Sequence, residues 1–591
     1  MYVFIAASLS KGEIIYLTKG EQMRWLSGLT IILLSFIPIA DGAFLRSIFL
    51  CNFLGKQFAT CNAELIQDSR ANAALPNFSS NSNSKTLLAQ RQPLGETVPP
   101  PIIVPPSINN PRPVNPGRFI NPALPNSGGN VPSLNQFVQQ AERAAFEVSF
   151  QQANTNRAVE LFEQYQANQF NSHLGINTQT KIPTTAEISQ ALAKIYQATG
   201  EKPALTYIVS LKNELHLILV LPSSQTASET SNTTISLKSH SKARGKNGTN
   251  HLAQQVSNTE RVVLKVSRPQ IKEMATKFIN EVKNQGIIRS NSGHKLYKEL
   301  ITPLEAKLKA NNIDTLIVSA DSGLRSIPIA ALNDGQQFLI EKYKYALIPS
   351  FGLTASHYTG KIQNAQILAM GVTQSIDNQP ALPSAGTEVS SLIKNIWQGK
   401  GLSLIDEKAT LENLTSTSKS QNFDILHFAT HAQFQPGQLS NSYIQVWNGK
   451  LQLNKLKNLS QELRWNQVSM LVLSACQTAL GDDQAELGFA GMGVQAGIKT
   501  AIGTLWKVND EAAMAFMTEF YSRLKTAPTK AEAFKQTQLA MSRGQLRVEN
   551  GNLQLSNQQT MNLPPEMGVR GNISFSHPIY WSRFTLVGDW N

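Results

Sequence analysis

The chain of 591 residues contains little cysteine. Of its three cysteines, Cys51 and Cys61 lie beside an N-terminal apolar region, and Cys476 lies in the part with the composition of a folded domain. If an export signal is removed beyond Cys61, the mature protein has one free thiol and no disulfide bond. The folded part therefore cannot depend on disulfide bonds between its own cysteines.

Several sequence signatures are also missing. The sequence has no repeat with a period of about 34 residues or a similar length, which excludes a helical solenoid. It has no Gly-x-Ser-x-Gly motif and no phosphate-binding loop, so nothing supports a serine hydrolase or a nucleotide hydrolase. The glycines from Gly488 to Gly493 lie in a stretch with helical patterning, which favours close packing of a helix on a sheet.

The formal net charge of +13 raises the question of an anionic partner. The compact basic cluster lies between Lys238 and Lys246, inside a Ser/Thr/Asn-rich stretch that is typical of a solvated loop. Aromatic residues that would stack on bases do not interleave the cluster. We therefore expect no nucleic-acid partner.

The first 132 residues do not have a foldable composition. The apolar runs Trp25–Ala40 and Phe44–Leu54 follow Arg24 and predict a signal peptide or a membrane anchor within residues 1–63. Pro93 to Pro132 holds twelve of the 28 prolines, which predicts a disordered linker over residues 64–132. The protein is thus expected to be exported, to the periplasm or the medium, or to be anchored to a membrane.

The remaining sequence alternates between helical and strand patterns. Residues 133–200 are helical in pattern, with Gly175 as a helix stop, and short apolar strands begin near Ala204. Further strands are predicted at 315–319, 367–370, 425–429, 470–474 and 501–505, and helices at 387–397, 487–496, 511–524 and 530–543. Strands that are apolar throughout are buried on both faces, so we expect an α/β fold with a mostly parallel sheet covered by helices.

Two of these strands end on residues that can cooperate chemically. The strand from Met470 leads to Cys476, and the strand from Ile425 leads to His431. Functional groups in parallel sheets gather at the carboxyl ends of the strands, where an imidazole can serve as the base of a thiol nucleophile. His427, which precedes His431 on the same strand, is expected to be a buried supporting residue. A zinc site of the two histidines is excluded, because His-x-x-x-His binds a metal from a helix and not from a strand.

These residues belong to a set of motifs that resembles the CHAT domain family of caspase-like and separase-like cysteine peptidases. The matching segments are His427-Phe-Ala-Thr-His431, Leu473-Ser-Ala-Cys476-Gln-Thr-Ala-Leu-Gly481, Gly503–Asp510, Leu382–Val389, His577–Trp581 and Leu586–Asp589. They occur in the order found in the family, and the similarity runs from about Val159 to the C-terminus.

The resemblance implies a caspase-like α/β/α sandwich with two halves. A degenerate half would cover residues 201–364 and a catalytic half residues 365–591. It also implies that Cys476 is the nucleophile and His431 the catalytic histidine, that the substrate is a protein or peptide, and that neither a metal nor an organic cofactor is needed. The backbone N–H groups of Cys476 and Ala432 would form the oxyanion hole.

Two positions leave alternatives open. Ala432 stands where the family usually has glycine; alanine keeps the N–H but loses easy access to positive φ, so an inactive caspase-like scaffold is the alternative function. Asp510 matches an acidic position that receives a basic P1 side chain in separase-like relatives, but it could equally be the N-cap of a helix beginning at Glu511. Asp482, Asp483 and Glu486 compete for the pocket, although a solvated acidic loop is the favoured interpretation of these three.

Overall fold

The computed structural model describes residues 134–175, 181–223, 258–284, 289–354, 362–478, 491, 493, 496–567 and 571–591. All of these residues belong to one compact unit, 126–591. The predicted signal or anchor region (1–63) and the predicted linker (64–132) lie outside the described residues, as does the acidic loop containing Asp482. Within the described ranges, no helix combines the length and the apolar character needed to cross a membrane.

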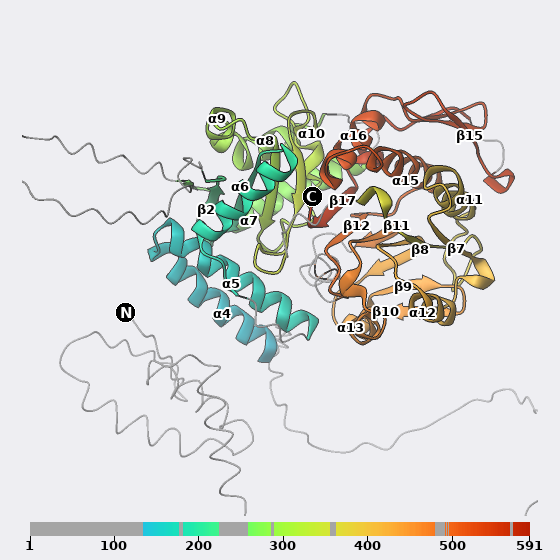
Figure 1. Cartoon of the computed structure of the whole chain (residues 1–591). Coiled ribbons are helices and arrows are strands. Elements are labelled where there is room, and N and C mark those ends of the chain that lie inside the picture. The colour runs from blue at the N-terminus through green and yellow to red at the C-terminus, as the bar shows by residue number, and fades with distance from the viewer. Residues whose placement is uncertain are drawn as a thin grey trace, which may run out of the picture. The chain divides into compact units, whose positions relative to one another are not determined.

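The unit is built around one sheet of 13 strands (Figure 1). Its strands are β1 (Pro203–Ser210), β2 (Leu215–Val220), β3 (Thr259–Leu264), β4 (Thr315–Ala320), β5 (Lys344–Leu347), β6 (Ile367–Gly371), β7 (Gly401–Ile405), β8 (Ile425–Phe434), β9 (Tyr443–Val446), β10 (Gly449–Gln452), β11 (Met470–Thr478), β12 (Thr500–Thr504) and β17 (Phe584–Gly588). The main path runs β10-β9-β8-β11-β12-β17-β5-β4-β1-β2-β3, and β6 joins it by pairing with β8 and with β7.

The direction of the strands reverses once near the middle of this sheet. The strands β6, β7, β8, β11 and β12 are parallel to one another. The strand β17 pairs with β12 in the antiparallel sense, and the strands β5, β4 and β1 continue in the direction of β17. The carboxyl ends of β8 and β11 therefore lie at one edge of the sheet, and those of β4 and β1 lie at the opposite edge.

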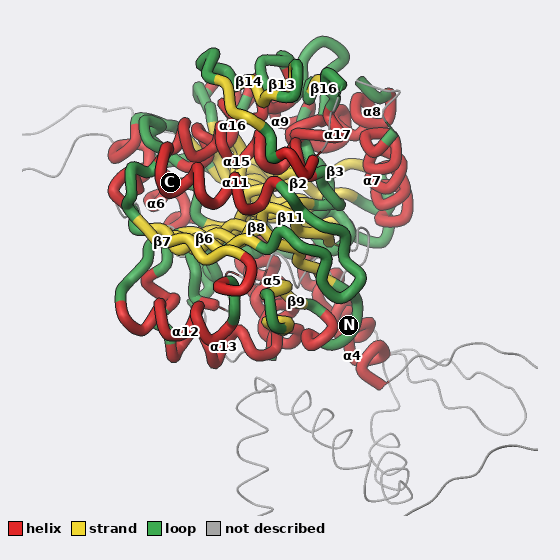
Figure 2. The backbone as a smooth tube through the Cα atoms, turned by 90° about the vertical axis from the view of Figure 1, so that its right-hand side faces the viewer, coloured by secondary structure: helices red, strands yellow, loops and turns green. Residues whose placement is uncertain are grey.

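Helices cover both faces of the sheet. They are α4 (Leu134–Gln152), α5 (Thr155–Leu174), α6 (Thr185–Thr199), α7 (Arg268–Lys283), α8 (Asn291–Leu300), α9 (Thr302–Ala310), α10 (Leu339–Lys342), α11 (Ser384–Ser391), α12 (Leu411–Ser420), α13 (Leu453–Glu462), α15 (Asp510–Leu524), α16 (Lys530–Ser542) and α17 (Pro578–Trp581). Figure 2 shows α11, α15 and α16 on one side of the strands and α12 and α13 on the other. The strands β1, β2, β4, β5, β6 and β12 are buried along their whole length, as expected for a sheet between two helical layers.

The α/β fold with a mostly parallel sheet is confirmed. The helical pattern that stops at Gly175 forms two helices, α4 and α5, because the chain breaks at Asn154, whose side chain caps α5 by accepting from the backbone N–H of Arg157. The predicted stop at Gly175 is confirmed, since this residue ends α5 in the left-handed conformation with φ of 60°. The second, four-stranded sheet was not anticipated; it consists of β13 (Arg547–Glu549), β14 (Asn552–Gln554), β15 (Thr560–Asn562) and β16 (Ile573–Ser574).

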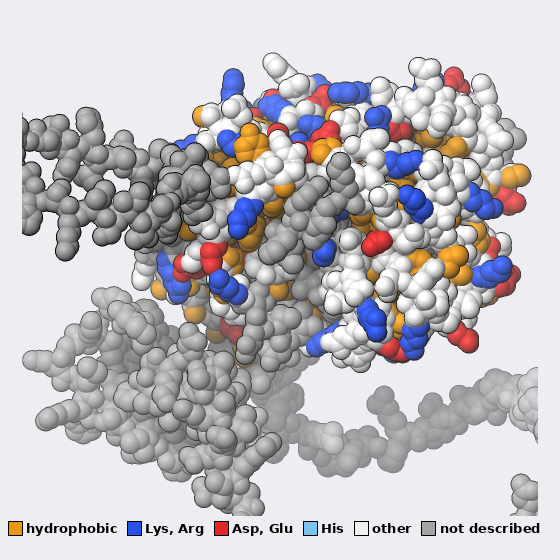
Figure 3. Space-filling view, in the orientation of Figure 1, with side chains coloured by type: hydrophobic (Ala, Val, Ile, Leu, Met, Phe, Trp, Pro, Cys, Tyr) orange, Lys and Arg blue, Asp and Glu red, His pale blue; other side chains and the backbone are white. Residues whose placement is uncertain are grey.

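The strands predicted from apolar runs are present, and the helix predicted at 387–397 begins earlier. It starts at Ser384 as α11 and continues as one π-helical turn over Leu392–Ile396. The sheet passes without interruption from residues of the predicted degenerate half to those of the catalytic half, through the pairing of β5 with β17. On the face in Figure 3, lysine and arginine side chains are scattered among acidic and uncharged ones.

Candidate active site

The strands that carry the predicted dyad are direct neighbours. The strand β8 pairs with β11 in parallel, and the register places Ala475 opposite His431 and Cys476 opposite Ala432. Adjacent strands lie about 4.8 Å apart. His431 and Cys476 are on neighbouring strands, offset by one residue in the register. Both residues lie in the last third of their strands, near the carboxyl edge of the sheet. The strands do not end on them as expected, because β8 continues to Phe434 and β11 to Thr478.

A β-bulge sets this register. Leu473 pairs with Phe428, but two residues later Ala475 pairs with His431, so β8 contains one extra residue at this point. Without the shift, Cys476 would lie opposite His431 itself. Bulges of this kind bend a strand and redirect its side chains, and they are frequent next to active sites.

The ring of His431 is half-buried and held by a backbone carbonyl. Its Nε2 lies 2.8 Å from the carbonyl oxygen of Pro380. A carbonyl oxygen accepts hydrogen bonds and cannot donate them, so Nε2 carries the proton and Nδ1 has the free lone pair of a neutral ring. Burial lowers the pKa of His431, the hydrogen bond to Pro380 opposes this change, and the positive charge of Lys507 adds to it.

The main chain of Cys476 lies in β11, whereas its side chain is outside what the structure describes. Ala432 is buried and lies in β8, paired with Cys476 on one side and with Ile444 of β9 on the other. Its φ is not among the positive values found in the described part of the chain. The backbone conformation at residue 432 is therefore accessible to alanine and does not require glycine.

His427 is fully buried in a polar network next to the candidate dyad. Its Nε2 donates to Oε1 of Glu388 at 2.8 Å, and its Nδ1 lies 3.2 Å from the hydroxyl of Tyr521. Ser474, two residues before Cys476, donates its hydroxyl to the other oxygen of Glu388 at 3.1 Å. Burial, with the negative charge of Glu388 as a second cause, raises the pKa of Tyr521 well above its ordinary value. The predicted burial of His427 is confirmed, and its ring contacts Glu388 and Tyr521.

The carboxylate of Asp510 is bound by the start of another helix. Ser384, the first residue of α11, donates its backbone N–H to Oδ2 at 2.7 Å and its hydroxyl to Oδ1 at 2.6 Å. Burial raises the pKa of Asp510 from its ordinary 3.8 to about 6, although the bonds from Ser384 oppose this change. The N-cap interpretation of Asp510 is wrong for its own helix: α15 begins at Asp510, and the N-cap position is Asn509.

One segment, 380–388, contacts the candidate site at three places that the sequence did not indicate. The carbonyl of Pro380 accepts from His431, Ser384 donates to Asp510, and Glu388 accepts from His427 and Ser474. The motif Leu382–Val389 is visible in the sequence. Its residue pattern does not show which residues from distant parts of the chain its side chains contact in the folded protein.

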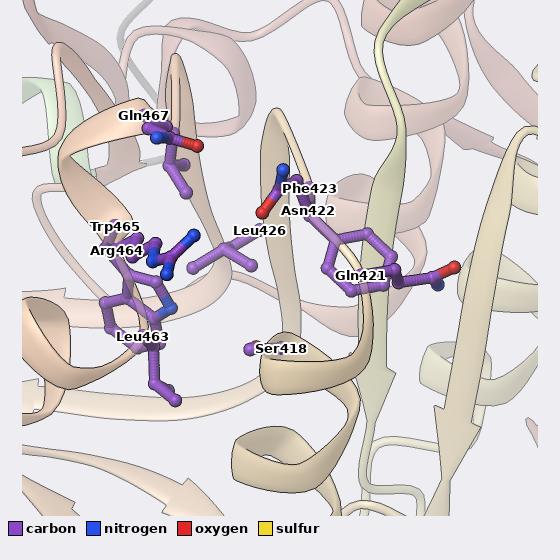
Figure 4. A pocket seen from close by; sticks show the side chains of 10 residues that line it. Ser418, Gln421, Asn422, Phe423, Leu426, Leu463, Arg464, Trp465 and Gln467 are labelled. Carbon is purple, nitrogen blue, oxygen red and sulfur yellow. The ribbon is translucent and has the colours of Figure 1, made fainter.

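A small pocket in the described part of the chain lies away from this edge (Figure 4). Its empty volume of about 250 Å³ includes open solvent, and Phe423, Leu426 and Val468 line it near the amino ends of β8 and β11. The predicted catalytic residues are at the carboxyl ends of the same strands. This pocket is therefore not part of the candidate site.

A sandwich of helices around a mostly parallel sheet, with histidine and cysteine on neighbouring strands at its carboxyl edge, defines the caspase-like class of α/β proteins. A family model described as the CHAT domain matches residues 290–589, just over half of the sequence. The chain belongs to the CHAT domain family. The match begins later than the resemblance that we traced from about Val159.

The solved structures that are similar to this chain include the following two. One is a chain of the Saccharomyces cerevisiae separase–securin complex, with a TM-score of 0.41 and 10% identity over 73% of this chain and 34% of that chain. The other is the complex of the Porphyromonas gingivalis RgpB pro- and mature domains, with a TM-score of 0.30 and 11% identity over 55% of this chain and 77% of that one. The chain thus spans about a third of the length of the separase–securin chain that it matches. No curated protein matches the sequence.

Proposed function

We propose that this CHAT-domain protein is a cysteine endopeptidase in which Cys476 is the nucleophile and His431 the general base. The main support is the register of β8 and β11, which brings the backbones of the two residues to neighbouring strands one step apart. The half-buried state of His431 and the hydrogen bond that orients its ring add to this support.

The environment of His431 suits the first proton transfer. With Nε2 donating to Pro380, Nδ1 of the neutral ring is the atom that accepts the proton of the Cys476 thiol. A lowered pKa favours this neutral form. The sulfur then bonds to the carbonyl carbon of the scissile peptide, and the imidazolium returns the proton to the leaving amine. Water, deprotonated by the same imidazole, hydrolyses the resulting thioester and regenerates the thiol.

The oxyanion formed during this attack would be held by the backbone N–H groups of Cys476 and Ala432. Asp510 would select a basic P1 side chain, because an ionised carboxylate pairs with arginine in a bidentate manner. The bonds from Ser384 leave the carboxylate with further acceptor capacity, since each of its oxygens has two lone pairs.

A non-catalytic interaction domain is the second candidate function. It is favoured by the position of Ala432, which has a strand partner on each side. A backbone N–H that is engaged in a strand ladder is not available to an oxyanion. Under this proposal Cys476 is an ordinary thiol and the caspase-like fold serves as a binding scaffold.

We further propose that the protein is exported or anchored to a membrane by its N-terminal apolar runs. Fractionation of cells that express the full chain tests this. Recovery of the uncleaved chain in the soluble cytoplasmic fraction would contradict it.

The test of the peptidase proposal compares the full chain with Cys476→Ala on a peptide library. We expect cleavage by the wild type, preferentially after arginine or lysine, and none by the variant above background. A wild type that cleaves no more than Cys476→Ala sinks the proposal. Labelling of Cys476 by iodoacetamide, followed by mass spectrometry of its peptide to separate it from Cys51 and Cys61, then distinguishes the candidates. If the protein is a non-catalytic scaffold, iodoacetamide should alkylate Cys476 no faster than an ordinary exposed thiol.

A further inference from the structure

The carboxylate of Glu388 connects the two strands of the candidate dyad. It accepts from Nε2 of His427 on β8 at 2.8 Å and from the hydroxyl of Ser474 on β11 at 3.1 Å. All three residues are buried, with exposed fractions of 3% for Glu388, 0% for His427 and 1% for Ser474. Charge-assisted hydrogen bonds in such a place are strong, and a lost partner leaves a costly unpaired group.

These contacts coincide with the β-bulge. Ser474 is the β11 residue between Leu473 and Ala475, where the pairing with β8 shifts. His427 lies on β8 opposite Val472, one residue before Phe428, whose pairing with Leu473 is the last before the shift. Strand register is weakly specified by backbone bonds alone, because a slip exchanges one set of equivalent bonds for another. A side chain that binds both strands at the bulge removes this freedom.

The helix that carries Glu388 is also held in place. Its helix, α11, starts at Ser384, which is bonded to Asp510 at the start of α15. On the far side of His427, the hydroxyl of Tyr521 on α15 lies 3.2 Å from Nδ1, and the two rings meet edge to face with centroids 5.6 Å apart. Two helices thus hold the carboxylate and the imidazole from above the sheet.

We infer that Glu388 is a positioning residue, which sets the register of β8 against β11 and thereby the placement of His431 relative to Cys476. This inference rests on the proposed peptidase function for its effect on activity, and on the structure alone for its effect on the strands. A one-residue slip would bring Cys476 opposite His431 instead of Ala432. Misplacement of reacting groups by about 1 Å is enough to cost roughly 100-fold in rate.

The test uses the full chain with Glu388→Gln and Glu388→Ala. Glutamine can accept from His427 and donate to Ser474, so it preserves both links without the charge, whereas alanine removes both. With a cleavable peptide, we expect Glu388→Ala to lower kcat roughly 100-fold and Glu388→Gln about tenfold, with KM within about twofold. Ser474→Ala, which removes one link, should lie between wild type and Glu388→Ala, and it keeps the test available if Glu388→Ala does not fold.

Glu519 provides the matched control. It is a buried glutamate on α15 with an exposed fraction of 2%, and it accepts from Arg523 and from the hydroxyl of Ser556 near the small sheet. Glu519→Gln and Glu519→Ala remove similar contacts away from the dyad. We expect them to lower the unfolding midpoint and to leave kcat within about twofold of wild type.

Amide hydrogen exchange of β8 and β11 separates this inference from the proposed function. Faster exchange at 425–434 and 470–476 in Glu388→Ala, but not in Glu519→Ala, supports positioning even if the wild type cleaves no peptide, in which case the peptidase proposal alone fails. Unchanged exchange in these strands overturns the inference. So does a Glu388→Ala variant whose kcat equals that of wild type.

Discussion

The two edges of the main sheet differ in what occupies the carboxyl ends of their parallel strands. At the edge formed by β8 and β11, His431 is half-buried and bonded to a single backbone carbonyl. At the opposite edge, the ends of β1 and β4 are covered by α4 and α5. There Arg143 binds Asp321 through two bonds of 2.8 and 2.7 Å, and Gln166 donates to the carbonyl of Ala320.

The covered edge also contains a buried glutamate with a complete set of donors. Glu163 on α5 accepts from the backbone N–H groups of Phe351 and Gly352, at 2.8 Å each, and from the hydroxyl of Tyr207. These polar groups form hydrogen bonds within the protein, and the bonds stabilise the packing of α4 and α5. The same sheet thus carries the candidate catalytic residues at one edge and buried polar contacts that stabilise the fold at the other.

The largest expected effect concerns the edge formed by β8 and β11. His431→Ala should reduce peptide cleavage by at least roughly 10⁴-fold, since removal of one member of a nucleophile–base pair disables the pair. His294→Ala is the matched control: this half-buried histidine lies with Nδ1 3.4 Å from the carbonyl of Asn333 in the other half of the chain. Steady-state kinetics of both variants decide the matter, and an equal loss in both would contradict the assignment of His431.

The second prediction concerns the covered edge. Arg143→Ala removes the salt-bridge partner of Asp321, whose side chain is 1% exposed, and should cost roughly 3–5 kcal/mol of unfolding free energy. Arg157→Ala breaks an exposed pair with Glu160 on α5 and should cost at most about 0.5 kcal/mol. Urea unfolding measures both. Equal costs would show that the covered edge does not stabilise the fold in the way described.

Asp510 and Asp321 should respond to pH in opposite directions. Burial raises the pKa of Asp510 to about 6, so its contribution to stability is present below its ordinary 3.8 and is lost as the pH rises through 6. Burial also acts to raise the pKa of Asp321, but the charge and hydrogen bonds of Arg143, the charge of Arg325 and the hydrogen bond from Ser210 together outweigh it, so the pKa is lowered. The contribution of Asp321 is therefore present above its ordinary pKa and is lost as the pH falls.

The unfolding free energy of Asp510→Asn relative to that of wild type should therefore increase by about 1 kcal/mol or more as the pH rises from 4.5 to 7.5. Thermal unfolding at the two pH values measures the change. A difference between variant and wild type that stays constant with pH would contradict the raised pKa of Asp510.

The smallest expected effect is electrostatic. Lys507→Met removes a positive charge that lowers the pKa of His431, so the acid limb of kcat/KM should move to higher pH. Because Lys507 is exposed, the change should be at most about fivefold at any pH on that limb. The pH profile of Lys408→Met, another exposed lysine, should coincide with that of wild type. A downward shift for Lys507→Met would exclude His431 as the group that must be neutral.

Much of the fold could be predicted because its signals are local. Apolar runs such as Met470–Ser474 bury both faces of a strand wherever they occur, and Gly175 ends a helix through its own backbone freedom. The short strands of the small sheet escaped prediction, because three-residue strands such as β13 carry too few residues to show a period.

The sequence by itself determined the residue types at two strand ends, Cys476 and His431, because strand length and apolarity are properties of contiguous residues. Tertiary structure decided the register between those strands, the carbonyl of Pro380 beside the imidazole, and the partner of Asp510 on another helix. Each of these is a contact between segments separated by tens of residues, and its energy depends on distance and burial that no local pattern encodes.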